Sequence, residues 1–317
     1  MKFLGVDISI KHLPELDSGY IPLGKFYSAF LSGAEKPLDI AVERSGGQVA
    51  VCRTRIHGTP DMAEADRYYV ERMIKTMLWL YGGFRVYLSG DKDICAAMQE
   101  IYSASGNQSF DFDYMANVYE HPFEVVYCDA VPEEKGDPKA IGRHLEGCRI
   151  GFDAGGSDRK VSAVVDGRTV YSEEVIWHPK TAADPRYHQR EVLCALRTAA
   201  AHLPRVDAIG VSTAGIVRGD ELMVSALLAA VPPERQQEGR TLYRRAAAAM
   251  GNVPLAVAND GDVTALAGYM SLGTGPVMGI AMGTSQAAGY VDAQGRVSGW
   301  LNELAFAPVD LAEAVVR

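Results

Sequence analysis

The sequence predicts an α/β protein with two domains, from its length, its periodicity and an internal repeat. The chain has 317 residues, more than one small core usually organises. In the second half, short apolar runs alternate with helical spacing, and a strand, turn and hairpin unit at 149–176 recurs at 277–301. A polar, proline-bearing stretch at 131–147 separates the halves. We therefore expect an N-terminal α/β domain over residues 1–147 and a second domain over residues 148–317.

The elements of the first domain follow from turn and helix-start residues. Arg44-Ser45-Gly46-Gly47 separates two apolar runs and predicts a hairpin, while Pro60-Asp61 is typical of a helix start. The element order matches that of the second domain, so a degenerate copy of the same fold is one interpretation. We expect strands at 38–43 and 48–53, a helix at 61–81, a strand at 84–88, a helix at 91–102 and a strand at 123–127.

The second domain shows the same kinds of pattern more clearly. Asp166-Gly167 between two alternating runs predicts a type I′ hairpin, and Val192, Leu196 and Ala199 share one face of a helix. We expect strands at 149–153, 161–165 and 169–176, a helix at 187–203, a strand at 208–212, a helix at 241–250, a strand at 255–258, a helix at 262–270, and strands at 277–282, 287–291 and 296–301.

The composition limits the partners. A formal charge of -9 gives no electrostatic reason to expect binding along a nucleic-acid backbone. The five cysteines form no CxxC pair, which argues against metal ligation and fits a reducing cytoplasm. No long apolar run and no signal peptide are visible. We predict a cytoplasmic protein that binds neither nucleic acid nor membrane.

A glycine loop follows the first strand of the second domain. Asp153 ends the strand, and Gly155 and Gly156 allow the backbone to turn tightly and approach a ligand. Together with Ser157, successive amides in such a turn can bind an anion. The Asp153 carboxylate is tolerable beside phosphates where Mg²⁺, bound through water, lies between them. A plain glycine turn is the structural alternative.

Two further segments complete the candidate site. Gly283-Thr284-Ser285 lies at the matching place in the second unit and offers amide and hydroxyl donors, although a polar turn explains it equally well. Asn259 and Asp260 lie between a buried strand and a helix, where Asp260 can accept the proton of a substrate hydroxyl. Asp262 is the better candidate for the helix N-cap, which leaves Asp260 for chemistry. We expect the Asp153 and Asp260 carboxylates to face one cleft, within roughly 10 Å.

In their order these motifs resemble the ROK family of sugar kinases and sugar-responsive repressors, within the actin-like ATPase superfamily. The resemblance implies a ribonuclease H-like lobe and a second, partial lobe. The matching residues are Asp153, Gly155 and Gly156 for the family's Asp-x-Gly-Gly motif, Asn259 and Asp260 for its Asn-Asp pair, Gly283-Thr284-Ser285 for its Gly-Thr-Gly loop, and Asn302-Glu303 for its Gly-Glu sugar contact.

The sequence departs from the family near its C-terminal end. Phe306 stands where the family has a histidine that helps to ligate zinc, and the cysteine-rich zinc motif is missing. The hairpin sheet at 277–301 is apolar on both faces, and too few residues follow to cover it. We expect a C-terminally incomplete sequence or a lobe completed by a partner chain, and a homodimer is left open.

The resemblance implies ATP-dependent phosphorylation of a hexose-type sugar hydroxyl, with ATP and Mg²⁺ as cofactors. Asp260 would be the general base, Asn259 and Glu303 would bind the sugar, and Asp153 would hold Mg²⁺ through water. The alternative is a nucleotide- or sugar-binding sensor that keeps the fold but transfers no phosphate. Phe306 favours the sensor, whereas the presence of both carboxylates favours the kinase.

Overall fold

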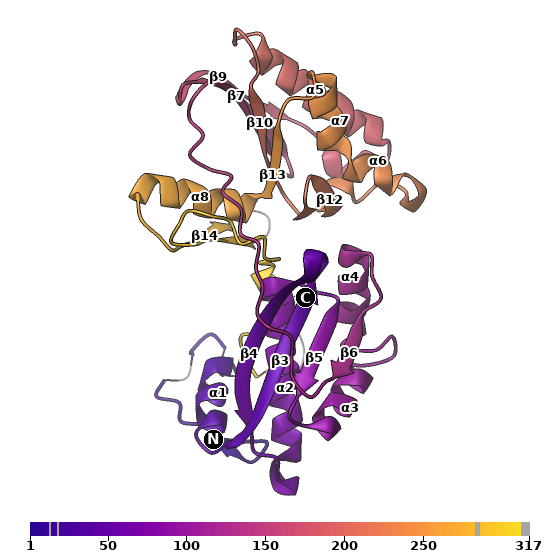
Figure 1. Cartoon of the computed structure of the whole chain (residues 1–317), viewed down its shortest axis with the longest axis vertical. Coiled ribbons are helices and arrows are strands. Elements are labelled where there is room, and N and C mark those ends of the chain that lie inside the picture. The colour runs from indigo at the N-terminus through magenta and orange to yellow at the C-terminus, as the bar shows by residue number, and fades with distance from the viewer. Residues whose placement is uncertain (13, 18, 283–285, 312–317) are drawn as a thin grey trace. The chain divides into compact units, whose positions relative to one another are not determined.

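The chain forms two compact units in the computed structural model, which describes all residues except 13, 18, 283–285 and 312–317. One unit comprises residues 1–137 with 300–317, and the other comprises residues 138–299 (Figure 1). Residues after 299 thus belong with the N-terminal unit, where Asn302 N donates to Leu80 O at 2.9 Å. The division differs from the expected 1–147 and 148–317. In the described part of the chain, no helix has the length and apolar character to cross a membrane.

The first unit contains a four-stranded sheet in the order β4-β3-β5-β6. The predicted hairpin around Arg44 is confirmed, because β3 and β4 pair antiparallel along their whole length. β5 pairs antiparallel with β3 and parallel with β6. The strands and helices are β1 (Lys2–Phe3), β2 (Val6–Asp7), α1 (Leu23–Leu31), β3 (Lys36–Arg44), β4 (Gln48–Ile56), α2 (Ala63–Tyr81), β5 (Arg85–Ser89), α3 (Lys92–Ile101), α4 (Ser109–Tyr119) and β6 (Glu124–Tyr127).

The sheet of the second unit has five strands, of which β7, β8 and β9 pair antiparallel and β7, β10 and β13 pair parallel. Its order is β13-β10-β7-β8-β9. The first three strands in sequence are β7 (Cys148–Ala154), β8 (Asp158–Val165) and β9 (Arg168–Ile176), which pair antiparallel in succession. β10 (Ala208–Thr213) runs parallel to both β7 and β13 (Leu255–Asn259). This strand order, with its antiparallel and parallel pairs, is the ribonuclease H-like arrangement, so the expected α/β fold class of this lobe is confirmed.

The type I′ hairpin between β8 and β9 is confirmed by its backbone. Asp166 has φ 47° and Gly167 has φ 78°, both in the left-handed region that this turn requires. The hairpin returns the chain so that Ile176 pairs with Asp158 at the far end. The end of β9 therefore lies next to the glycine loop that precedes β8.

Two helices cover one face of this sheet. α5 (Pro185–Ala200) packs on β7 and β8, and α7 (Leu242–Ala249) packs beside α5 (Figure 1). Alternate residues of the strands point into this core, including Ile150, Phe152 and Val211, all of which are buried. Between α5 and β13 the chain also forms the short strands β11 (Ile216–Arg218) and β12 (Glu221–Val224), the 3-10 helices Ala226–Leu228 and Pro233–Arg235, and the short helix α6 (Gln236–Arg240).

The last helix of this unit packs on a hairpin through glycines. α8 (Asp260–Leu272) lies against β14 (Val277–Met282) and β15 (Gln286–Val291), which pair antiparallel. A Cβ at Gly289 would come within 2.2 Å of Gly261 O, so the two backbones touch directly. The strand expected at 296–301 is wrong, because only Val297 there forms bridges, one to Val291 and one to Lys139.

Candidate functional site

The candidate site lies at the ends of three neighbouring strands. In the register of the sheet, Ser212 of β10 pairs with Asp153 on one side and with Ala258 on the other. Because adjacent strands are about 4.8 Å apart, the backbones of Asp153 and Ala258 are about 10 Å apart. Asn259 and Asp260 follow Ala258 directly, and so lie at the same edge as Asp153. Carboxyl ends of parallel strands are where ligand groups collect in α/β sheets.

The glycine loop after β7 is closely surrounded. Trp177, which is only 2% exposed, donates from Nε1 to Gly155 O at 2.8 Å, and its backbone N donates to Ser157 O at 3.1 Å. A Cβ at Gly155 would approach Asp158 O to 2.9 Å. These contacts hold the loop in a narrow turn that side chains larger than hydrogen would disturb.

A lysine that the sequence did not point to lies beside this loop. A Cβ at Gly156 would be 3.0 Å from Lys180 Nζ, so the ammonium group sits over the loop backbone. The short 3-10 helix Pro179–Thr181 carries Lys180, and the buried His188 holds it in place, with Nε2 3.1 Å from Pro179 O. The only hint in the sequence was the β8–β9 hairpin, which brings this segment back to the loop.

Asp153 is partly open to solvent and has a cationic neighbour. Its side chain is 41% exposed, and Lys160 Nζ lies 4.0 Å from Oδ2. Lys160 also pairs with Asp158 and, at 3.8 Å, with Glu174. An exposed carboxylate beside a phosphate-sized loop is compatible with a Mg²⁺ contact through water. Among the described residues, no three His, Cys, Asp or Glu side chains gather in a way that could hold a metal ion.

Asn259, and not Asp262, caps α8. Its Oδ1 accepts from Gly261 N at 2.7 Å, while its Nδ2 donates to Gly215 O at 2.9 Å. The side chain thereby ties the loop after β10 to the start of α8. The expectation that Asp262 is the cap was wrong, because Asp262 falls within the first turn and is buried. The Asn259 side chain also hydrogen-bonds the Asp260 carboxylate, which partly offsets the effect of burial on the pKa of Asp260.

Asp260 occupies the first turn of α8. Its Oδ1 accepts from Gly261 N at 3.1 Å, and burial raises its pKa, to which the charge of Asp153 adds. The electrostatic influence of Asp153 agrees with their placement at one sheet edge. A carboxylate with a raised pKa is a stronger base than an ordinary aspartate, which suits proton transfer.

A cavity adjoins the strand ends on the face of the sheet opposite to α5. Its volume is about 610 Å³, in the range of small-molecule sites. Glycine, alanine and serine occupy half of the sheet positions along it, so the backbone itself forms part of the wall. The lining residues are Ile141, Gly151, Phe152, Asp153, Lys160, Val161, Ser162, Ser172, Glu173, Glu174, Gly210, Val211, Ser212, Ala256, Ala258, Val263 and Leu266.

Two predicted parts of the site, Glu303 and the second loop, lie outside the described residues of the second unit. Glu303 belongs to the first compact unit, where burial raises the pKa of Tyr114 and the Glu303 charge adds to the effect. In the same unit, Phe306 stacks on Trp79 with ring centroids 4.4 Å apart. Gly283, Thr284 and Ser285 lie outside the described residues. A role for Glu303 and for the second loop in ligand binding stays a prediction.

The comparisons with known proteins give structural neighbours only. No family model and no curated protein matches the sequence. A ROK hexokinase from Thermus thermophilus aligns with TM-score 0.40 and 21% identity, over 50% of this chain and 51% of that chain. A glucokinase from Parabacteroides distasonis aligns with TM-score 0.37 and 17% identity, over 48% and 46%. A ROK family transcriptional regulator, a homologue of the E. coli MLC protein, aligns with TM-score 0.38 and 20% identity, over 50% and 41%. The chain thus spans about half the length of these neighbours, which include kinases and a regulator of the ROK family.

Proposed function

We propose that the second compact unit binds ATP through the glycine loop and transfers its terminal phosphoryl group to a sugar hydroxyl. The observation that carries this proposal is the register of β7, β10 and β13. It brings an aspartate beside a phosphate-sized turn to the same edge as a partly buried aspartate at a helix start. Phosphoryl transfer needs little more than such positioning and charge stabilisation.

The residues of the loop fit a phosphate group. A Cβ at Gly155 would lie 2.9 Å from the backbone oxygen of Asp158, so this tight turn requires glycine there, and successive amides in such a turn can bind an anion. Lys180 adds a positive charge at the same place, and Asp153 is exposed enough to face a hydrated cation. When bound, Mg²⁺ and ATP would supply the phosphoryl group and partly neutralise its charge.

The protein side of the reaction has three parts. The loop amides and Lys180 bind and orient phosphate oxygens, which develop more charge in the transition state. Asp260 accepts the proton from the sugar hydroxyl as that oxygen attacks phosphorus. Asn259 caps the start of α8 and hydrogen-bonds the Asp260 carboxylate, and so holds Asp260 in position beside the sugar.

The test is turnover by the full chain over a panel of hexoses, followed as ADP release and as sugar phosphate by mass spectrometry. Asp260→Asn preserves the shape of the side chain but cannot take the proton. We expect it to bind ATP as the wild type does and to lose about 10²–10⁴-fold in turnover. Asp220→Asn, in the turn between β11 and β12, is the matched control and should leave turnover unchanged.

The outcomes separate the possibilities. Near-normal turnover of Asp260→Asn would limit Asp260 to a structural role at the helix start. ATP binding by the wild type without transfer to any sugar would contradict the kinase and favour the sensor. Failure to bind ATP at all would contradict the assignment of the glycine loop.

A further inference from the structure

A buried histidine of α5 donates to two separate turns of the second unit. His188 has no exposed surface, and its Nε2 lies 3.1 Å from Pro179 O and 2.8 Å from Leu227 O. Carbonyl oxygens only accept, so Nε2 carries the hydrogen and shares it between the two. Nδ1 is shielded from water and has no hydrogen-bond partner among the residues that the structure describes. The polar role of this ring therefore depends on Nε2.

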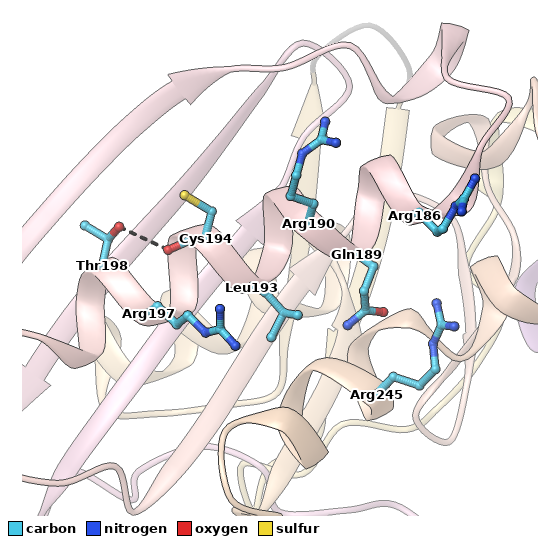
Figure 2. Close-up of a pocket in the computed structure, with 8 residues that line it drawn as sticks. All are labelled: Arg186, Gln189, Arg190, Leu193, Cys194, Arg197, Thr198 and Arg245. Carbon is cyan, nitrogen blue, oxygen red and sulfur yellow. Dashed lines mark hydrogen bonds between the residues drawn. The ribbon is translucent and has the colours of Figure 1, made fainter.

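His188 lies on the face of α5 that is turned toward the core. Val192 and Ala195, four and seven residues further along the helix, are buried on the same face. Figure 2 shows other side chains of α5, such as Arg190 and Arg197, which line a pocket outside the core. A polar ring inside a core needs hydrogen-bond partners, and the two turns supply them.

The first turn, residues 177–181, covers the glycine loop. Trp177 donates to the backbone of this loop at two points, and Lys180 Nζ lies beside it. Pro179 directly precedes Lys180 in the chain. The hydrogen bond from His188 to Pro179 O therefore fixes the backbone from which the ammonium group reaches the loop.

The second turn, residues 226–228, packs against the first and also contacts the loop after β10. Ser225 Oγ accepts from Leu227 N at 3.1 Å and donates to Ala214 O at 2.6 Å. Leu227 thus receives a hydrogen bond from α5 at its carbonyl oxygen and is linked through its amide to the loop after β10.

The loop after β10 leads on to the start of α8. A Cβ at Gly215 would lie 2.4 Å from a backbone oxygen of β12, so the loop is packed closely against the strand that precedes the second turn. Gly215 O accepts from Asn259 Nδ2 at 2.9 Å, and Asn259 caps the helix that begins with Asp260. A series of hydrogen bonds and backbone contacts therefore joins His188 to the Asp260 end of the site.

We propose that His188 is a positioning residue, which holds the Lys180 turn against the glycine loop and ties it to the loop that supports Asp260. This inference rests on the proposed function of the glycine loop in binding ATP. His188 itself contacts neither ligand in this role. Without its donor, each turn loses a hydrogen bond to α5. Tyr187 Oη, which accepts from His178 N at 2.9 Å, then holds only the start of the first turn.

The test compares two substitutions of the same residue by calorimetric titration with ATP and with adenosine. His188→Leu removes the donor and keeps an apolar side chain in the core, whereas His188→Gln keeps an N–H donor at a similar distance from the backbone. We expect His188→Leu to weaken ATP binding about tenfold and to leave adenosine binding unchanged, because the effect reaches the ligand through Lys180. His188→Gln should restore ATP binding. General damage to the fold would weaken the binding of both ligands.

A double variant tests whether the effect passes through Lys180. In the Lys180→Gln background, His188→Leu should change ATP binding by no more than about twofold, the usual scatter of independent effects. His202→Leu replaces an exposed histidine of the same unit and is the matched control. The proposal is overturned if the two substitutions weaken ATP binding additively, or if His188→Gln binds ATP as poorly as His188→Leu.

Hydrogen exchange of the ligand-free chain tests the same inference independently of ATP. His188→Leu should accelerate exchange in peptides that cover residues 154–160, 177–182 and 226–228, whereas His188→Gln and His202→Leu should not. If the wild type binds no ATP and exchange still changes in this way, the proposed function fails and the positioning of the turns by His188 is supported. Unchanged exchange in His188→Leu overturns the inference whether or not ATP binds. If His188→Leu does not melt cooperatively, His188→Asn, whose amide is too short to reach both carbonyl oxygens, replaces it in every measurement.

Discussion

Lys180 shows how much the charge of one side chain can matter at the glycine loop. Its Nζ lies beside Gly156, and in the described part of the chain it makes no hydrogen bond or ion pair. An ammonium group at this place is available to a phosphate oxygen, and a hydrogen bond to a charged group contributes about 1.5–3 kcal/mol.

Lys180→Gln should therefore weaken ATP binding roughly ten- to a hundredfold while leaving adenosine binding unchanged. Calorimetric titration with ATP, ADP and adenosine measures the difference. Lys139→Gln, an exposed lysine of the same unit, is the control. Equal affinity of Lys180→Gln and wild type for ATP would show that Lys180 does not contact phosphate.

Some residues of the candidate site could be predicted from the sequence, and others could not. Asp153, Asn259 and Asp260 could be found because each lies at or just after the end of an apolar strand, which is a local pattern. The choice of Asp262 as cap failed because Asn259 and Asp262 are both good cap residues, and only the backbone at the strand end decides between them. Lys180 could not be found, because its position depends on a hairpin that returns the chain over the length of β8 and β9.

At the scale of secondary structure, the backbone contact between α8 and β15 fixes where Asp260 begins its helix. A Cβ at Gly289 would lie 2.2 Å from Gly261 O and 2.4 Å from Asp262 Cα, both of them backbone atoms. Neither atom belongs to a flexible side chain, so relief requires that the helix or the hairpin move.

Gly289→Ala should destabilise the second unit by about 1–3 kcal/mol and displace the start of α8. We expect a lower melting temperature together with reduced turnover. Gly210→Ala is the control, because a Cβ there meets no atom within 4 Å, and its stability should stay equal or rise slightly. Unchanged melting of Gly289→Ala would mean that α8 and β15 are not in backbone contact.

The helix α4 was not predicted from the sequence, and the core of the first unit explains why. α4 escaped notice because its inner face carries Asp111, which is fully buried. Lys75 Nζ lies 2.6 Å from this carboxylate, and Trp79 Nε1 donates to it at 3.2 Å. In a sequence, an aspartate indicates a solvent-facing position. Its partners on α2 become visible only in three dimensions.

At the scale of the whole molecule, each compact unit has its own hydrophobic core. The core of the first unit gathers residues from Val6 to Leu311, and the main core of the second runs from Ile150 to Ala247. The shared element order that favoured two copies of one fold does not extend to strand direction. β5 runs antiparallel to β3, whereas β10 runs parallel to β7. The alternation of apolar and polar residues along a strand indicates which side chains are buried, but not whether the adjacent strands run parallel or antiparallel to it.

Residues 138–299 should therefore fold when expressed alone, because their cores draw on no residue of the other unit. The glycine loop, Lys180, Asn259 and Asp260 all belong to this segment. We expect one cooperative thermal transition and ATP binding equal to that of the full chain. If Glu303 binds the sugar, as the family resemblance implies, the segment should also lose transfer to sugars, and Glu303→Gln in the full chain should reproduce that loss with ATP binding intact. A segment that fails to melt cooperatively, or that no longer binds ATP, would show that the second unit depends on the first for its fold or for its nucleotide site.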